Sequence, residues 1–217
     1  MRAQIDQTEK HEMKNNPYSN APRLPEGDQV VLTDVLPGTG PCMLEIGSGR
    51  GAFALDWAAQ HPEGRLLALE IRRKYAAQLG ERFAARGLTH ARSFAEDARE
   101  ALRRPRADGC VQFVAIHFPD PWWKKRHAKR LVLADQLVVD IARLLAPGGV
   151  VLVQTDVDTR ADEYLARFAA NPAFRNMAVG EGARFVDESP FAPARSNREA
   201  RAIADGLPVY RIAMQRV

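Results

Sequence analysis

The stretch "LEIGSGRGAF" (residues 44–53) decides the fold, because three glycines join an apolar run to a helical pattern. Gly47, Gly49 and Gly51 stand where a predicted buried strand, residues 41–47, passes into a predicted helix, residues 51–61. Glycines at such a turn let the backbone approach a ligand, and the first turn of the helix offers free N–H groups. The stretch therefore predicts a ligand-binding turn in an α/β domain.

The rest of the chain repeats this alternation of short apolar runs and helical patterns. Strands are predicted over residues 64–70, 110–118 and 150–156, with a helix between the last two marked by Leu133, Leu137, Ile141 and Leu145. Alternating strands and helices predict a doubly wound, mostly parallel Rossmann-like sheet. Residues 206–217 predict a final antiparallel strand near the sheet edge. We expect one domain over residues 29–217, preceded by a flexible polar arm, residues 1–28.

Acidic residues accompany three successive strands of the predicted sheet. Glu45 lies just before the glycine turn, Glu70 ends the next strand and Asp97 follows the third. A carboxylate beside the turn would repel a pyrophosphate but would accept hydrogen bonds from an ammonium group, so the pattern favours S-adenosyl-L-methionine over a dinucleotide. In that interpretation Glu45 faces the methionine end, Glu70 the ribose hydroxyls and Asp97 the adenine. There are two alternatives: a glycine loop that binds no ligand, and an oxidoreductase that binds NAD.

A second stretch, "HFPDPWWKKRHAKR" (residues 117–130), places an acid before a basic run. Asp120 follows the fourth predicted strand between two prolines that stiffen the turn, so it should lie near the reacting methyl group. Basic side chains at a helix N-terminus oppose the helix dipole and are unfavourable there without a counter-ion. The run therefore favours a nucleic-acid phosphate partner over a solvated face. Its basic residues are Lys124, Lys125, Arg126, Lys129 and Arg130, with His127 as a further phosphate or water contact.

Asp156, in "VQTDVDTRADEY" (residues 153–164), ends the following strand. It belongs to the same edge of the sheet as Asp120, where it either caps the next helix or contacts the substrate. Spacing alone leaves both roles open.

Together these motifs resemble the bacterial tRNA (guanine-N(7)-)-methyltransferase family over residues 42–213. The resemblance is carried by "EIGSGRG", "FPDPWWKKRHAKR", "TDVDTRADEY" and "SNREARAIADGLPVYR". It implies methyl transfer from S-adenosyl-L-methionine to guanine N7 at position 46 in the tRNA variable loop, without a different protein subunit. A monomer or homodimer is expected, and no metal.

The resemblance also implies roles for individual residues. Asp120 matches the catalytic acid, and the cofactor contacts match Glu45, Gly47, Gly49, Glu70, Asp97 and Asp120. Substrate contacts match Lys124, Asp156, Ser196 and Glu199, and RNA contacts match Lys125, Arg126, His127, Lys129 and Arg130. The chain departs from the family at Ala128, at Leu131 and at Arg198, which replaces an aromatic residue.

Two other functions fit part of this pattern. One is a methyltransferase that acts on another RNA, and the other is an RNA-binding protein with a vestigial cofactor site. The acids at positions 45, 70, 97 and 120 argue against the second.

Composition sets the remaining expectations. The chain has 217 residues, a formal net charge of +4 and no apolar run long enough for a membrane span. Cys42 and Cys110 lack a CxxC partner, and the N-terminus has no apolar stretch. We therefore expect a cytoplasmic protein with free thiols and no membrane partner.

Overall fold

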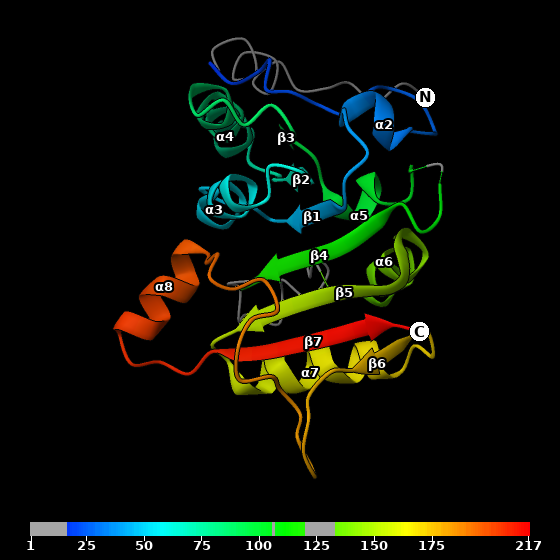
Figure 1. Cartoon of the computed structure of the whole chain (residues 1–217), viewed down its shortest axis with the longest axis vertical. Helices are drawn as coiled ribbons and strands as arrows, with labels where there is room; N and C mark the ends of the chain where they lie inside the picture. Colours follow the sequence, from blue (N-terminus) through cyan, green and yellow to red (C-terminus); the bar gives the residue numbers. More distant parts are fainter. Residues whose placement is uncertain (1–16, 106, 120–132) are drawn as a thin grey trace, which may run out of the picture.

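The computed structural model describes residues 17–105, 107–119 and 133–217, and within them seven strands form one sheet (Figure 1). The sheet order is β3-β2-β1-β4-β5-β7-β6. The strands are β1 (Cys42–Ile46), β2 (Arg65–Leu69), β3 (Ala91–Phe94), β4 (Val111–His117), β5 (Leu145–Thr155), β6 (Phe174–Asn176) and β7 (Tyr210–Arg216). The helices are α2 (Leu32–Val35), α3 (Ala52–Gln60), α4 (Arg73–Ala85), α5 (Ala98–Ala101), α6 (Asp135–Leu144), α7 (Asp158–Ala169) and α8 (Asn197–Ala204).

The topology confirms the predicted doubly wound sheet. Strands β1 to β5 pair in parallel, and β7 pairs antiparallel with β5. The strand order reverses between β1 and β4, which is where open α/β sheets bind ligands, outside the carboxyl ends of the strands. Helix α8 lies beyond the carboxyl ends of β4 and β5 (Figure 1). The short strand β6, which the sequence does not predict, forms the edge outside β7.

Alternate residues of the central strands feed two separate cores, one on each face of the sheet. Leu44, Val114 and Val151 face one core, which also contains buried residues of α5, α6 and α7. Their neighbours Met43 and Ala115 face the other, which contains Trp57 of α3 and residues of α4. Both faces of the sheet are therefore covered, as expected for near-continuous apolar strands.

The helix before β5 ends earlier than its apolar stripe indicates. Leu145 is buried, but it begins β5 instead of ending α6, and it pairs with Val111 of β4. The register then shifts, so that Phe113 faces Val150. The sequence "APGG" thus lies in the irregular start of a strand, because the backbone is already extended at Leu145, before the proline is reached.

The described part of the predicted arm contacts the domain. Ala21 and Leu24 are buried, and Arg23 pairs with the buried Glu96 at 2.8 Å. The backbone N–H of Ala95 donates to the carbonyl of Pro22 at 2.7 Å. Residues 1–16 lie outside the described residues, so the flexibility of the arm stays a prediction. Among the described residues, no helix is long and apolar enough to cross a membrane.

Candidate functional site at the carboxyl edge of the sheet

In the glycine turn between β1 and α3, Gly51 packs closely against another side chain, whereas Gly47 borders open space. Gly51 has φ +74°, and a Cβ there would lie 2.3 Å from Leu79 Cδ1. Gly47 has φ +75°, yet a Cβ there would meet nothing within 4 Å. A side chain at Gly51 would press on Leu79 of α4 and would have to adopt a left-handed φ, so glycine is favoured there. Gly47 leaves a cradle that a ligand can approach.

Glu45 points from β1 into the interior beside this turn. The residue is 1 % exposed, and its Oε2 has no hydrogen-bond partner among the described residues. Burial raises the pKa of Glu45 to about 8, and the nearby Glu70 adds to the effect. A buried carboxyl group without a partner is unfavourable and calls for a cationic ligand.

Glu70, at the end of β2, holds the turn from its other side. Its Oε2 accepts a hydrogen bond from the backbone N–H of Gly49 at 2.8 Å, and its Oε1 accepts from the backbone and Nε of Arg72, each at 2.9 Å. The Glu70 side chain is 3 % exposed, whereas that of Arg72 is 61 % exposed. The Arg72 guanidinium can therefore move into solvent and leave acceptor positions on Glu70 for ligand hydroxyls.

Asp97 repeats this arrangement after β3. It caps α5 by accepting from the backbone N–H of Arg99 at 3.0 Å, and it pairs with the Arg99 side chain at 2.5 Å. The hydrogen bond from Arg99 lowers the pKa of Asp97, so this carboxylate is charged in the neutral range. The three predicted acids thus lie in or after three neighbouring strands, and two of them, Glu70 and Asp97, pair with an arginine two residues further along.

A row of buried polar side chains continues across the sheet beyond Glu45. His117 of β4 stands in register with Gln154 of β5, which in turn faces Arg211 of β7. His117 Nδ1 lies 2.6 Å from Gln154 Oε1, and His117 Nε2 lies 3.9 Å from Glu45 Oε1. Burial lowers the pKa of His117, so its imidazole is neutral at physiological pH.

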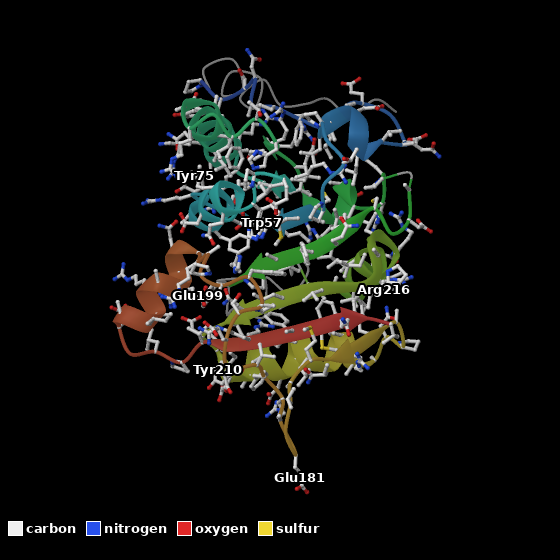
Figure 2. The ribbon with its side chains drawn as sticks, viewed as in Figure 1. Trp57, Tyr75, Glu181, Glu199, Tyr210 and Arg216 are labelled. Carbon is white, nitrogen blue, oxygen red and sulfur yellow. The ribbon has the colours of Figure 1, made fainter. Side chains whose placement is uncertain are left out.

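Helix α8 brings two predicted substrate contacts to the end of this row. Ser196 caps the helix, and its Oγ accepts a hydrogen bond from the backbone N–H of Glu199 at 3.1 Å. Glu199 is 1 % exposed and pairs with Arg211 at 3.0 Å through Oε1, while its Oε2 has no partner among the described residues. Figure 2 labels Glu199 between α8 and the carboxyl ends of β4 and β5.

Arg198, which departs from the family pattern, pairs with Asp156. Asp156 directly follows β5, and helix α7 begins two residues later with Val157 as its N-cap, so Asp156 does not cap that helix. Of the two roles that spacing leaves open, capping is excluded. The pair connects the end of β5 to α8.

A cavity of about 220 Å³ lies beside Glu199 and Arg211. Its other lining residues come from the segment before α8: Asp187, Glu188, Ser189, Ala192, Ala194 and Arg195. The cavity is lined by charged and hydroxyl groups, which suits a polar ligand.

The end of β4 has a backbone conformation that is rare for a side-chain-bearing residue. Phe118 has φ +49°, the left-handed region that favours glycine. Such strain is concentrated at functional sites. Asp120 and the basic residues Lys124, Lys125, Arg126, His127, Lys129 and Arg130 follow, and they lie outside the described residues.

Several residues of this edge were not singled out from the sequence. His117, Gln154 and Arg211 are polar positions on the inward face of strands that otherwise read as apolar. Their period of two with Ala115, Leu152 and Ala213 is a usable signal, because it places them on the same face as Met43 and Glu45. Nothing in the sequence marked Arg72 and Arg99 as partners of Glu70 and Asp97, except that each arginine lies two residues after its acid.

The described residues fit S-adenosyl-L-methionine. A buried, unpartnered carboxyl oxygen suits an ammonium group, the open cradle at Gly47 suits a ligand that lies against backbone, and Glu70 is placed for ribose hydroxyls. A strand order of this kind with a reversed β7 and this set of acids defines a Rossmann-like methyltransferase.

Comparisons with known proteins confirm that class and give the family. The family described as "Putative methyltransferase" matches residues 39–212. A tRNA (guanine-N(7)-)-methyltransferase of Nostoc sp. (strain PCC 7120) is 40 % identical over 179 residues, which cover 81 % of this chain and 80 % of the relative. One of Anaeromyxobacter dehalogenans is 40 % identical over 197 residues, 87 % of this chain and 96 % of the relative. The chain belongs to the tRNA (guanine-N(7)-)-methyltransferase family, which makes it an enzyme that uses S-adenosyl-L-methionine.

Solved structures support the fold. The 16S rRNA methyltransferase KamB superposes with a TM-score of 0.63 at 16 % identity, over 90 % of this chain and 98 % of that one. An S-adenosylmethionine-dependent O-methyltransferase of Thermotoga maritima gives a TM-score of 0.53 at 17 % identity, over 100 % of this chain and 68 % of that one.

Proposed function

We propose that this enzyme transfers a methyl group from S-adenosyl-L-methionine to N7 of guanine 46 in the tRNA variable loop. The observation that carries the proposal is the continuous polar edge from Glu45 to Glu199, which joins a cofactor cradle to a second polar cavity. The relatives that match this chain are named for guanine N7 of tRNA. The proposed compartment is the bacterial cytoplasm, and a monomer or homodimer suffices.

On the cofactor side, three acids divide the work of binding. Glu45 accepts from the ammonium group of the methionine part, Glu70 accepts from the ribose hydroxyls after Arg72 moves aside, and Asp97 lies by the adenine. Gly47 and Gly49 leave room for the ligand against the turn. The cofactor supplies an electrophilic methyl group on its sulfonium.

Guanine N7 has a lone pair in the ring plane and no proton to remove, so the enzyme needs no strong general base. The main task of the protein is to align N7 with the methyl group, and such alignment supplies several kcal/mol. Positive charge develops on the purine during transfer. We assign the stabilisation of that charge to two carboxylates, Asp120, the proposed catalytic acid that comes after β4 in the sequence, and Asp156, which follows β5.

Guanine is selected over adenine at α8. The free Oε2 of Glu199 accepts hydrogen bonds from the N1 and N2 donors of guanine, which adenine lacks, while Arg211 fixes the other oxygen. Ser196 holds Glu199 by capping the helix. The cavity beside Glu199 takes the base.

RNA is held by the basic run. N7 faces a deep and narrow groove in an RNA helix, so the target base must be unstacked or already in a loop. Lys124 contacts a phosphate of the substrate next to the target base, and Lys125, Arg126, His127, Lys129 and Arg130 bind the neighbouring backbone.

The test is methyl transfer from labelled S-adenosyl-L-methionine to bulk tRNA that lacks 7-methylguanosine. Reduction followed by aniline cleavage maps the modified base. Cleavage at the variable-loop guanine is the expected result. Labelling at another nucleotide would overturn the proposed target, and absence of labelling alongside tRNA binding would favour the RNA-binding alternative.

A further inference from the structure

His117 and Glu45 form a buried pair that the methyl-transfer mechanism does not use. Their side chains are 4 % and 2 % exposed, and the His117 ring also contacts Phe53, with 4.4 Å between ring centroids. Both groups retain an unsatisfied atom among the described residues, Nε2 of His117 and Oε2 of Glu45. Unsatisfied buried polar atoms are costly, and two of them side by side call for an explanation.

The tautomer of His117 follows from its other neighbour. Nδ1 lies 2.6 Å from Oε1 of Gln154, and an amide oxygen only accepts hydrogen bonds. With the Gln154 amide oxygen oriented toward the ring, Nδ1 carries the proton and Nε2 presents a lone pair toward Glu45. A protonated carboxyl group is the one state of Glu45 that can satisfy this lone pair.

The separation of the two groups permits the bond. Nε2 and Oε1 of Glu45 are 3.9 Å apart, longer than a direct hydrogen bond. A small rotation of the carboxyl group brings the two atoms within hydrogen-bond distance. The register supports the pairing, because β1 and β4 are neighbours and both side chains point to the face covered by α3.

We propose that His117 is a positioning residue for cofactor binding, whose Nε2 accepts a hydrogen bond from the protonated carboxyl group of Glu45 in the free protein, and that cofactor binding releases the Glu45 proton. The inference rests on the proposed role of Glu45. The balance is simple: a neutral Glu45 and a cofactor with a cationic ammonium group become a carboxylate–ammonium pair, and one proton goes to solvent. His117 stays neutral throughout and keeps its bond to Gln154.

Charged groups around the pair are already occupied. Glu70 faces Glu45 from β2 and is bonded to Gly49 and Arg72. Glu199 faces His117 from α8 and is paired with Arg211 of β7. Among the described residues, these are the charged groups that packing brings toward the pair, and Gln154 of β5 is neutral. The raised pKa of Glu45, about 8, agrees with a proton held there at neutral pH.

Calorimetry of S-adenosylhomocysteine binding tests the inference. Titrations at pH 7.5 in buffers of different ionisation enthalpy give the number of protons released per ligand, and we expect most of one proton for the wild type. Affinity should also rise with pH below 8, by up to about tenfold per unit. The α-amino group of the ligand titrates near the same pH, but equally for every variant.

Two substitutions distinguish the contributions of the two nitrogens of the His117 ring. H117N keeps a donor near Nδ1 and removes Nε2, so proton release should fall to about half and the midpoint of the affinity profile should move down by about half to one pH unit. H117Q places an amide oxygen near the position of Nε2, so it should restore the wild-type profile. H90Q is the matched control, because His90 bonds to the carbonyl of Ala58 away from the site.

Five outcomes decide whether the inference holds. Reduced release in H117N with recovery in H117Q supports the positioning role. An unchanged profile in H117N, or an equal shift in H90Q, would overturn it. Binding and methyl transfer by the wild type without proton release would overturn this inference alone. Failure of the wild type to bind the ligand would overturn the cofactor role of Glu45 as well.

Discussion

Glu45 places a carboxyl group where the chain gains no stability from it. Its pKa is raised from 4.5 to about 8, chiefly by burial, so the folded protein binds more protons than the unfolded chain between these values. The free energy of unfolding therefore falls as the pH rises through this interval. Retaining such a group makes sense if a cationic ligand pairs with it, which is a trade of stability for binding.

The variant E45Q should change both the affinity for the cofactor and the pH dependence of the unfolding free energy. We expect the cofactor to bind at least about tenfold more weakly, because the amide cannot pair with an ammonium group. The wild type should lose about 1–3 kcal/mol of unfolding free energy between pH 6 and pH 8, and E45Q should lose less. Urea unfolding at the two pH values and calorimetry measure these effects. An equal pH dependence in both proteins would contradict the assigned protonation.

Arg198 is the second residue whose substitution tests the site, because it pairs with Asp156, a proposed substrate contact. R198A should leave the Asp156 carboxylate unpositioned and lower kcat/KM for tRNA by about tenfold, a loss of about 1.4 kcal/mol. Cofactor affinity should not change. Unfolding free energy should change by less than about 1 kcal/mol, since the Arg198 side chain is largely exposed.

R201A is the matched control for Arg198. Arg201 lies on the same helix and pairs with Asp205 at 3.3 Å, away from Asp156. Steady-state kinetics with tRNA should separate the two variants. Equal losses in both would indicate a general effect of α8 instead of a role for the Asp156 pair.

Helix α8 depends on one hydroxyl group for its start. Ser196 satisfies the backbone N–H of Glu199, and the same turn holds the Glu199 carboxylate against Arg211. A loss of the cap therefore affects both the stability of the helix and the place where guanine is proposed to bind.

S196A should lower the unfolding free energy by about 1 kcal/mol and raise the KM for tRNA. S196D keeps a capping oxygen and should restore the stability. Thermal unfolding and steady-state kinetics are the measurements. A stable S196A protein with unchanged KM would show that the cap neither holds α8 nor places Glu199.

At the scale of helices and strands, the sequence predicts most of these elements but not the side-chain contacts between them. The strand that carries Glu45 and the helix that begins after Gly51 follow from apolar runs and glycines. The edge strand β6 has only three residues and no pattern of its own, so it had no signal. Pairings such as Arg198 with Asp156 or Glu199 with Arg211 depend on tertiary approach between distant segments, which local patterns do not encode.

On the scale of the whole molecule, the sheet topology gathers residues that are far apart in sequence. Parallel strands carry Glu45 and His117 to one edge, and the reversed β7 brings Arg211 to the same edge from its starting end. Cofactor and base are thereby proposed to meet along one row of side chains. The basic run follows β4 in the sequence and is the segment that we propose binds RNA.

The salt dependence of tRNA binding tests that larger surface. K124A and R126A should each weaken tRNA binding. Each should also reduce the slope of log affinity against log salt by about 0.7–0.9, the change expected for the loss of one phosphate contact. R175A is the control, since Arg175 lies on the edge strand β6. Filter binding over a range of salt measures the slopes. Unchanged slopes in K124A and R126A would contradict the phosphate contacts.

One measurement tests the central claim most directly. Two tRNA transcripts are prepared, one with guanine at position 46 and one with 7-deazaguanine there, which has carbon in place of N7 and keeps the N1 and N2 donors. With labelled S-adenosyl-L-methionine, the first should accept about one methyl group per molecule, and the second should bind with similar affinity but accept none. Equal labelling of both transcripts would contradict N7 of guanine 46 as the methyl acceptor.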